Sequence, residues 1–276
     1  ELLRLATFRL IFTIFQLARL PHRNRTGPMS IPTPDNPVQW GCYERLLPAE
    51  IEAIQSTHPV VYLPWGALEY HGKHASVGLD GLKAHGLCKG LAAVAGGLVL
   101  PPVYIAANTI KTAPDLEFPR HSLDFAESTV SLLAREHFDQ LADEGVKVVF
   151  TLCGHVGQPH YDLIKAEAVA ADERHPNTHF LATSETDLVS PDLFIVNHAA
   201  LGEVALLMAS DPDCVKLDRL PADREPTLKD DAVWGPDPGD ATIAKGKTYA
   251  AAFVTAASER IKSLLNSSSS SIIDSP

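Results

Sequence analysis

The chain has 276 residues, of which 45% are apolar and 21% are charged, which is enough to bury one sizeable core in a single large domain. Its 34 acidic residues outnumber 23 lysines and arginines, for a formal net charge of −11, which disfavours nucleic acid or an anionic membrane as a partner and favours a small molecule. Four cysteines without a C-x-x-C pair indicate neither a disulfide framework nor a zinc ribbon, so a reduced, cytoplasmic setting is the simplest interpretation.

The two ends of the chain differ from its middle. Residues 1–28 hold five arginines and one acid, with an apolar run of only nine residues between Arg9 and Arg19, far short of the roughly 20 needed to span a bilayer. Such a stretch is typical of a transit peptide or an interfacial helix. Because Met29 opens a segment that resembles a natural start, we interpret residues 1–28 as an extension outside the core, 29–266 as the folded domain and 267–276 as a disordered Ser-rich tail.

Apolar runs and helical patterns alternate in the first half of the domain. Residues 59–66 (PVVYLPWG) are typical of a buried strand, and residues 81–97 of a helix that leads into a strand at 98–103. Residues 124–145 give the clearest helical pattern, with an expected acid cap at Asp124, Glu127 three positions on, and a glycine stop.

The second half repeats this alternation. Residues 146–153 (VKVVFTLC) form a β-branched run without polar alternation, as expected for a strand covered on both faces. A helix at 160–173, a strand at 178–185 and a helix at 199–210 are predicted to follow. This order predicts an α/β fold with a mainly parallel sheet between helices, and a functional site at the carboxyl ends of the strands.

Residues 68–80, LEYHGKHASVGLD, contain an unusual density of possible metal ligands just after the first predicted strand. Glu69 and His71 are two apart, so in extended backbone they point to the same side. Asp80 precedes the next predicted helix and could turn back to the same point, or could simply be its N-cap. His74 is the weaker histidine, a supporting donor or a plain loop residue.

Two further motifs lie beyond later elements. TLCGHVGQPH places His155 after the most apolar strand, where a further ligand could point into a cleft; an ordinary strand-end histidine is the alternative. NHAALGEVALLM places His198 before a helix and Glu203 within it. Five helical positions rotate by roughly 140°, so His198 and Glu203 share a site only if His198 precedes the regular helix, and Glu203 could otherwise be a structural carboxylate.

Taken in order and spacing, these motifs resemble the creatininase (creatinine amidohydrolase) family. The residues that carry the resemblance are Glu69-Tyr-His71-Gly-Lys-His74 with Asp80, Gly154-His155-Val-Gly157-Gln158, and His198-Ala with Glu203. Weaker matches are EFPRHSL at 117–123 and VWGPDPGDATIAKGK at 233–247, so that the resemblance runs from about residue 38 to 265.

The resemblance implies a three-layer α/β/α catalytic domain, commonly a homohexamer, that hydrolyses a C–N bond of a small cyclic or linear amide. It implies one or two divalent ions, zinc or manganese with Fe²⁺ as an option, held by Glu69, His71, Asp80 and His155, with Asp80 bridging. Such ions lower the pKa of a water and polarise an amide carbonyl. His198 corresponds to the family's proton shuttle, and Glu203 is grouped with it as catalytic.

Several departures from creatininase itself point to a different substrate. Creatininase has Tyr and Glu where this chain has Val156 and Gly157, and that Glu is a metal ligand, so one ligand is missing. Its Trp-Asp pair is replaced by Phe194 and Ile195, and Gln158 and Lys73 replace an Asn and a Pro. Relatives that act on other amides, including formamide-type pyrimidine intermediates, tend to have glycines there. Two alternatives remain, a peptide-maturation protease on the same scaffold and a non-catalytic metal-binding or assembly member.

Overall fold

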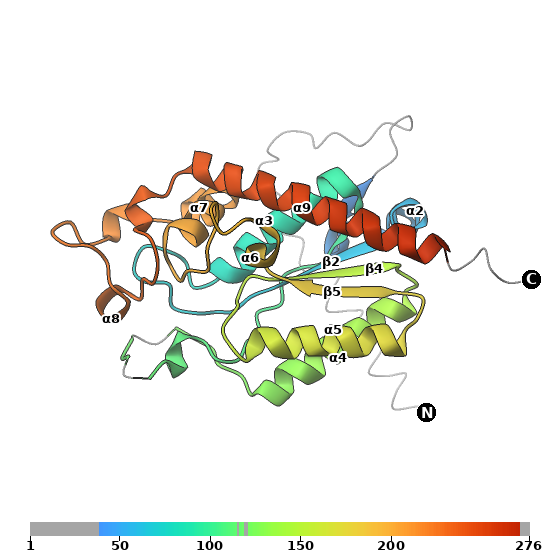
Figure 1. Ribbon diagram of the computed structural model, residues 1–276, viewed down its shortest axis with the longest axis horizontal. Helices are drawn as coiled ribbons and strands as arrows, with labels where there is room; N and C mark the ends of the chain where they lie inside the picture. Colours follow the sequence, from blue (N-terminus) through green and yellow to red (C-terminus); the bar gives the residue numbers. More distant parts are fainter. Residues whose placement is uncertain (1–38, 115, 119–120, 271–276) are drawn as a thin grey trace, which may run out of the picture. The chain divides into compact units, whose positions relative to one another are not determined.

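The computed structural model describes residues 39–114, 116–118 and 121–270, and its centre is a parallel sheet of five strands in the order β1-β3-β2-β4-β5 (Figure 1). The strands are β1 (Trp40–Cys42), β2 (Val60–Trp65), β3 (Gly97–Val99), β4 (Val148–Cys153) and β5 (His179–Thr183). The last four overlap the four predicted strands, although β3 ends at Val99 and not at residue 103. The predicted α/β fold with a mainly parallel sheet is confirmed. The short strand β1 was not predicted.

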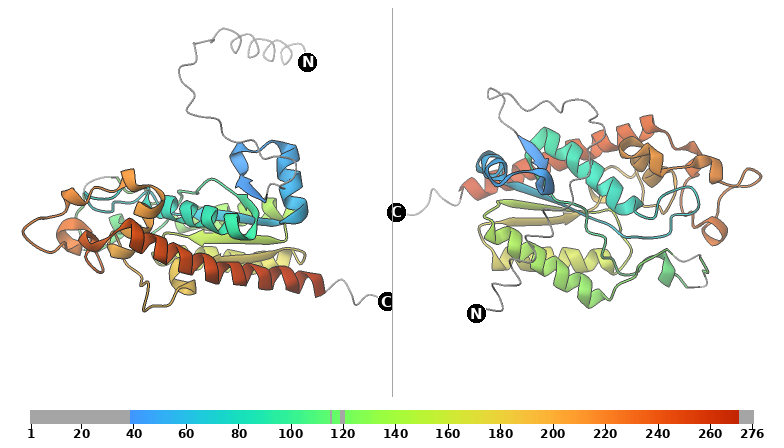
Figure 2. Two further views of the ribbon diagram at one scale, coloured as in Figure 1. Left: turned by 90° about the horizontal axis from the view of Figure 1, so that it is seen from above. Right: turned by 180° about the vertical axis from the view of Figure 1, so that it is seen from behind.

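Helices cover both faces of this sheet and make three layers (Figures 1 and 2). They are α2 (Pro48–Thr57), α3 (Leu79–Ala95), α4 (Glu127–Asp143), α5 (His160–Arg174), α6 (Glu185–Leu188), α7 (Leu201–Ser210), α8 (Leu228–Asp231) and α9 (Ile243–Ser270). Short 3-10 turns span Tyr43–Arg45, Ile110–Thr112, Pro212–Cys214, Leu217–Arg219 and Pro238–Asp240. Helices α4 and α5 lie on one face, and α3, α7 and α9 on the other.

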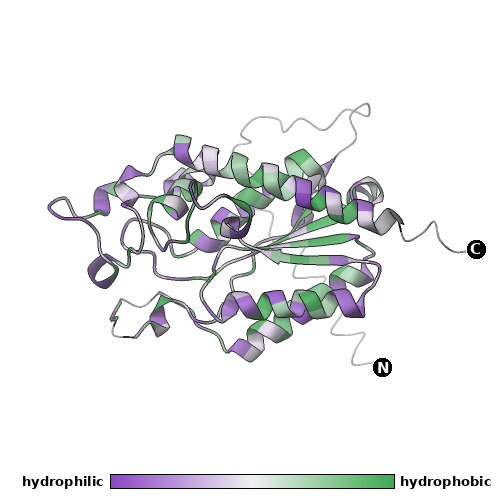
Figure 3. Cartoon of the chain, in the orientation of Figure 1, coloured by the Kyte–Doolittle hydropathy of each residue, from purple (hydrophilic) through white to green (hydrophobic). Residues whose placement is uncertain are grey.

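The sequence of β4 is apolar except for Thr151, and this follows from its position inside the sheet. Val149 and Cys153 pack into the cluster formed with α4 and α5, whereas Val148, Phe150 and Leu152 pack into the cluster formed with α3 and α9. Alternate side chains of a strand point to opposite faces, so a strand between two helix layers needs apolar residues at every position. Figure 3 shows the strands as mostly apolar between amphipathic helices.

The start of α4 differs from the prediction. The cap position is Ala126, which makes no side-chain capping bond, so the expected acid cap at Asp124 is wrong. Asp124 instead accepts a hydrogen bond of 2.7 Å from the backbone N–H of Thr109 and so ties down a loop beside the predicted site. At the other end, Gly145 turns the chain with φ +77° after Asp143, as the glycine stop predicted.

The C-terminal helix α9 was also not predicted. It continues to Ser270, so residues 267–270, which we expected to begin a disordered tail, are helical. Residues 271–276 and the predicted N-terminal extension at 1–28 lie outside the described residues. No helix in the described part of the chain combines the length and apolar character needed to cross a membrane.

Candidate metal centre

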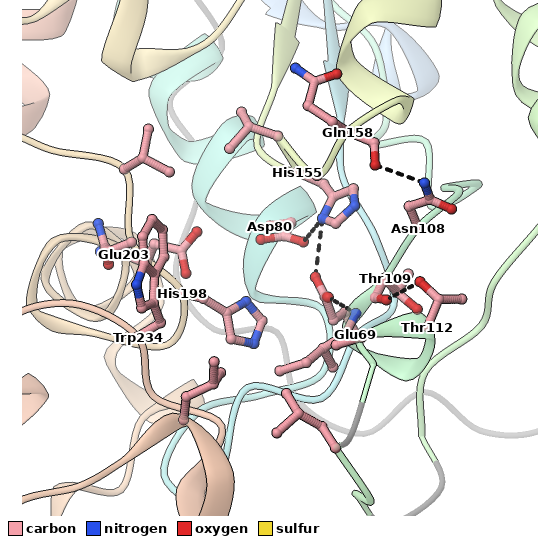
Figure 4. A pocket seen from close by; sticks show the side chains of 18 of the residues that line it. Glu69, Asp80, Asn108, Thr109, Thr112, His155, Gln158, His198, Glu203 and Trp234 are labelled. Atoms are coloured by element: carbon pink, nitrogen blue, oxygen red, sulfur yellow. Dashed lines mark hydrogen bonds and ion pairs between the residues drawn. The ribbon is translucent and has the colours of Figure 1, made fainter.

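The candidate residues gather at the carboxyl ends of β2 and β4. These two strands pair in parallel from Val60 with Val148 to Trp65 with Cys153, so they end at the same edge of the sheet. Figure 4 shows Glu69, Asp80 and His155 pointing toward one another at this edge, with His198 beside them.

The loop after β2 brings the first motif together. We expected Glu69 and His71 in extended backbone at the strand end, but β2 stops at Trp65 and both lie in the following loop. The backbone N–H of Glu69 donates to the carbonyl of Val77 at 2.8 Å. This bond closes the loop, and it places Glu69 next to the first turn of α3, where Asp80 lies.

Asp80 is held against the strand ends by close backbone packing. It is the second residue of α3, whose cap position is Gly78, so it is not the N-cap. A Cβ atom at Gly154, just after β4, would lie 2.2 Å from the Asp80 carbonyl oxygen, and one at Gly66, just after β2, would lie 2.2 Å from the Gly81 nitrogen. Glycine at both positions therefore allows the helix to approach both strands.

Glu69, Asp80 and His155 form the first group of possible ligands. His155 Nδ1 lies 3.1 Å from Glu69 Oε2 and 3.5 Å from Asp80 Oδ2. Atoms bonded to one zinc ion at about 2.0 to 2.2 Å are about 3.3 to 3.6 Å apart in tetrahedral geometry. The three side chains are almost fully buried, and they are spaced as ligands of one ion would be.

The second group consists of His71, Asp80 and Glu203. His71 Nε2 lies 3.3 Å from Asp80 Oδ1 and 3.8 Å from Glu203 Oε2, and the possible ligand atoms of the group all lie within 4.8 Å of one another. Asp80 thus offers one oxygen to each group. This is the arrangement that a carboxylate bridging two ions requires.

Backbone carbonyls set the ring orientation of both histidines. His71 Nδ1 is 3.0 Å from the carbonyl oxygen of Glu69, and His155 Nε2 is 3.3 Å from that of Ala107. A carbonyl only accepts, so in the neutral rings these nitrogens carry the hydrogen. The lone pairs of His71 Nε2 and His155 Nδ1 then face the carboxylates, as in metal-ligating histidines.

Three buried atoms at the centre of the site have no hydrogen-bond partner among the described residues: Glu69 Oε2, His71 Nε2 and Asp80 Oδ2. Buried polar atoms are normally paired, because leaving one unpaired costs about 1 to 3 kcal/mol. These atoms belong to the predicted ligands and face the shared centre. The donor set therefore fits the divalent ions that the sequence predicts.

Charge pairing dominates the electrostatics of the metal-free site. Burial alone would raise the pKa of Asp80, but His71 and His155 hold it well below its usual range. Burial alone would lower the pKa of His155, but Glu69 and Asp80 raise it well above the usual histidine range. In the metal-free protein, protons on the imidazoles therefore balance the carboxylates.

His198 lies before the regular helix α7. This is the position that it needs in order to share a site with Glu203. Its Nε2 lies 3.1 Å from the Tyr70 carbonyl oxygen, and its ring stacks on His71 with the centroids 4.4 Å apart. Burial, followed by the charge of His71, lowers the pKa of His198. The ring is therefore neutral near pH 7, with the hydrogen on Nε2 and a lone pair on Nδ1.

Two charged residues next to the site were missed by sequence reasoning. Lys83, one turn after Asp80 on α3, lies 2.7 Å from Glu203 Oε1 and 2.5 Å from Glu185 Oε1, and all three side chains are buried. Lys83 could have been noticed in the sequence, because a lysine among the apolar residues of a helix often has a buried charged partner. No local pattern marked Glu185, whose partners are distant in sequence.

The second loop histidine, His74, supports the site without joining either ligand group. It is buried, and its Nε2 lies 2.8 Å from the carbonyl oxygen of Ala199. Ala199 has the left-handed value φ +52° and donates its N–H to Glu203 Oε2 at 2.8 Å. His74 therefore fixes the bend that separates His198 from α7.

A cavity of about 590 Å³ opens beside these groups. Its volume suits a small ligand. The lining includes the candidate residues Glu69, Asp80, His155, His198 and Glu203, polar side chains at Asn108, Thr109, Gln158 and Asn197, and apolar residues such as Ile110, Leu116, Val156, Val196 and Trp234.

Comparisons with known proteins agree on one family. The model of the creatininase family, described as creatinine amidohydrolase, matches residues 44–261. A creatinine amidohydrolase of Pseudomonas putida is 28% identical over 178 residues, which are 58% of this chain and 68% of that protein. Residues 44–261 contain all six candidate residues.

Solved structures show the same fold. A creatininase with one tryptophan replaced by phenylalanine matches with a TM-score of 0.68 and 22% identity, over 80% of this chain and 97% of the other. A crystal structure of creatinine amidohydrolase matches with a TM-score of 0.67 and 22% identity, over 82% and 97%.

Proposed function

The chain belongs to the creatininase family, and on this premise we propose that it is a metal-dependent amidohydrolase that cleaves a C–N bond of a small cyclic or linear amide. One observation carries the proposal. Asp80 offers one oxygen to each of two ligand groups, and three buried ligand atoms that face the shared centre have only the other candidate ligands within reach. The cavity beside them gives a small molecule room to reach this centre.

The ligand types support zinc or manganese, with Fe²⁺ as a further option. Carboxylate and imidazole ligands suit these ions, and similar solved structures include a creatininase of Zn–Zn type and a manganese creatininase. Glu69, Asp80 and His155 would hold one ion. His71 and Asp80 would contribute to a second. When bound, such an ion polarises an amide carbonyl and lowers the pKa of water.

In catalysis, the side chain of His198 is proposed to transfer a proton. His198 is neutral, and its Nε2–H is fixed on the carbonyl oxygen of Tyr70, so Nδ1 is free to accept a proton. We assign to Nδ1 the removal of a proton from the attacking water and its delivery to the departing nitrogen. A positioned acid–base group of this kind typically contributes about 10²- to 10⁴-fold to the rate.

The substrate is proposed to be a creatinine-like or formamide-like amide rather than creatinine itself. Phe194, which stands where creatininase has tryptophan, is buried, and its ring lies 5.5 Å from that of Tyr249 in the core. Ile195 replaces the expected aspartate and is apolar. One related creatininase has been solved with creatine, but this chain lacks the side-chain pair expected to recognise such a ligand.

The oligomeric state, the partner and the cellular compartment are also part of the proposal. We propose a homo-oligomer, a hexamer as the family resemblance implies, that acts on a small molecule and not on nucleic acid or a membrane. The four cysteines are free thiols, which supports a reducing, cytoplasmic compartment.

Metal analysis combined with a substrate panel tests this function. The purified protein should contain zinc or manganese by elemental analysis and should hydrolyse at least one of a set of small cyclic and acyclic amides. His155→Ala is expected to lose metal and activity together. His198→Gln is expected to keep its metal and lose mainly kcat, because the histidine carries the proton and not the ion.

Three results would contradict the proposal in different ways. Hydrolysis of short peptides but not of small amides would favour the peptide-maturation alternative. A metal-loaded protein inactive on every substrate would favour the non-catalytic member. Full kcat in His198→Gln would remove the assigned proton shuttle while leaving the metal site intact.

A further inference from the structure

Trp234 is a large apolar side chain that lies exposed at the cavity. Its exposed fraction is 53%, whereas the preceding residues Ala232 and Val233 are buried. It lines the cavity together with Val196, which is 42% exposed. Folding usually covers most of a tryptophan, and aromatic surface left open inside a cavity is typical of a ligand contact.

The main chain holds Trp234 beside the proposed proton carrier. The Trp234 N–H donates to the carbonyl oxygen of His198 at 2.9 Å, and the His198 N–H donates to that of Trp234 at 2.8 Å, so the two residues form an antiparallel bridge. Residues that exchange both bonds in this way project their side chains to the same face, with Cβ atoms about 4.5 to 5.5 Å apart. The indole therefore lies next to the His198 imidazole (Figure 4).

Close packing and hydrogen bonds fix the backbone on both sides of Trp234. Gly235 has the positive value φ +127°, and a Cβ atom there would lie 2.7 Å from Asn197 Cβ, so this position requires glycine. On the other side, the Val233 N–H donates to the carbonyl oxygen of Thr227 at 3.1 Å. A ligand therefore meets an aromatic side chain whose backbone needs no ordering, which lowers the cost of binding.

The other side chains of the cavity favour an uncharged ligand. Lysine and arginine are absent from the part of its lining that the structure describes, whereas Glu69, Asp80 and Glu203 supply carboxylates. A phosphate or carboxylate on the part of a ligand away from the metal centre would lack a cationic partner there, which is costly. Asn108 and Gln158 also line the cavity, and their amides can hydrogen-bond to a neutral polar ring.

We propose that Trp234 is a specificity-determining residue that stacks on an uncharged aromatic or heteroaromatic ring attached to the scissile amide of the substrate. This proposal names the substrate class of the proposed function and rests on it. With the ring against the indole, the amide can reach the metal centre and Nδ1 of His198. The cavity of about 590 Å³ has room for the ring as well as the amide.

Binding of two ureas to the zinc-loaded protein tests the stacking without relying on turnover. Phenylurea and cyclohexylurea are both neutral and similar in size, but only phenylurea has a planar ring. Calorimetry of the parent should give a dissociation constant about 2- to 10-fold lower for phenylurea, as expected for an aromatic pair. Trp234→Ala should lose this preference. Trp234→Phe should keep part of it, because a phenyl ring also stacks.

Leu193→Ala is the matched control for Trp234→Ala. Leu193 is another exposed apolar residue, with an exposed fraction of 37%, and it lies outside the lining of the cavity. Its replacement should leave the preference for phenylurea unchanged. The charge argument has its own ligand, 4-ureidobenzoate, which carries a carboxylate on the same ring and should bind the parent about tenfold more weakly than phenylurea.

Hydrolysis of formanilide and N-cyclohexylformamide extends the test to turnover. The ratio of their kcat/KM values should fall about 2- to 10-fold from the parent to Trp234→Ala, mainly through KM for formanilide. Comparing this ratio between parent and variant cancels the different reactivity of the two leaving amines.

The outcomes separate this proposal from the proposed function. Equal binding of the two ureas by the parent, an unchanged preference in Trp234→Ala, a lost preference in Leu193→Ala, or tighter binding of 4-ureidobenzoate would overturn it. A parent that hydrolyses small amides without any preference for a planar ring keeps the proposed function and loses only this assignment. A parent that shows the preference and loses it in Trp234→Ala, but hydrolyses no amide, keeps Trp234 as the ring-binding residue and loses the function.

Discussion

At the scale of single residues, His71 and the carboxylates around it make the stability of the metal-free protein depend on pH. Burial alone would lower the pKa of His71, but Asp80 and then Glu203 raise it to about 9. Histidine in an unfolded chain has a pKa near 6.5. Because the folded pKa is the higher one, this stabilisation is complete below pH 6.5 and is lost as the pH rises through 9.

The metal-free protein should therefore lose stability between pH 6.5 and 9, by up to about 1.4 kcal/mol per pH unit from His71. The zinc-loaded protein should lose less, because the ion takes the place of the proton. Urea unfolding at pH 6.5, 7.5 and 9, with EDTA or with zinc, measures the difference. His71→Gln is the control and should flatten the metal-free curve; an equally steep curve would assign the pH dependence to other groups.

Gly157 is a second residue whose surroundings make a definite prediction. Gly157→Ala should destabilise the protein by about 1 to 3 kcal/mol, because the new methyl group overlaps Asn108 and the ring of His155. It should also weaken binding of the ion at His155, since that ring must shift. Chemical denaturation and zinc titration of the same variant measure both effects.

Gly90→Ala provides a matched control for Gly157→Ala. Gly90 lies within α3, and a Cβ atom there would lie 3.6 Å from Val254 Cγ2, an ordinary contact. Alanine favours a helix over glycine by about 1 kcal/mol, so this variant should be as stable as the parent or slightly more stable. The steric argument fails if the two substitutions have the same effect.

Spacing in the sequence was enough to place most of the site, but not its supporting charges. Glu69, His71 and Asp80 fall within one short segment, so their convergence could be expected. Lys83 and Glu203 are 120 positions apart in the sequence, and their bond exists only because α3 and α7 lie side by side. Whether Glu203 faces the candidate ligands or is only a structural carboxylate of its helix could not be decided from the sequence.

At the scale of elements, β2, β3 and β4 were predictable because both of their faces are buried, whereas α9 was missed. The signal for α9 was present, since Phe253, Ala257 and Ile261 recur every four residues and are buried against the sheet. It was obscured by glycine, threonine and serine at the two ends of the segment. Tertiary packing on the sheet, more than local propensity, supports a helix of this composition.

Packing of α9 against the sheet can be tested at Phe253. This side chain is fully buried, and its ring lies 6.4 Å from that of Phe150 in β4. Phe253→Ala should cost about 3 to 5 kcal/mol of unfolding free energy. Thr255→Ala, at an exposed position of the same helix, should change stability by less than about 0.5 kcal/mol. A small effect at Phe253 would mean that α9 contributes little to the core.

At the scale of the whole molecule, all six candidate residues come from the same chain and from the range 69–203. Metal binding is therefore expected not to depend on residues from another subunit. Charge is unevenly distributed along the chain: residues 1–28 carry five arginines and one acid, so the remaining residues have 18 basic and 33 acidic side chains, a net charge of −15. The basic segment contributes none of the candidate ligands.

Deletion of residues 1–28 should accordingly leave the melting temperature within about 2 °C of the parent and the metal content unchanged, because segments without a share in the core are removed at little cost. Differential scanning fluorimetry and elemental analysis measure the two properties, and light scattering shows whether the assembly keeps its mass.

A full-length control removes charge without shortening the chain: glutamine replaces Arg4, Arg9 and Arg19 together. A drop of more than about 5 °C on deletion but not on charge removal would show that the apolar run of the segment packs against the domain. An equal drop in both variants would instead show that the arginines pair with the acidic domain.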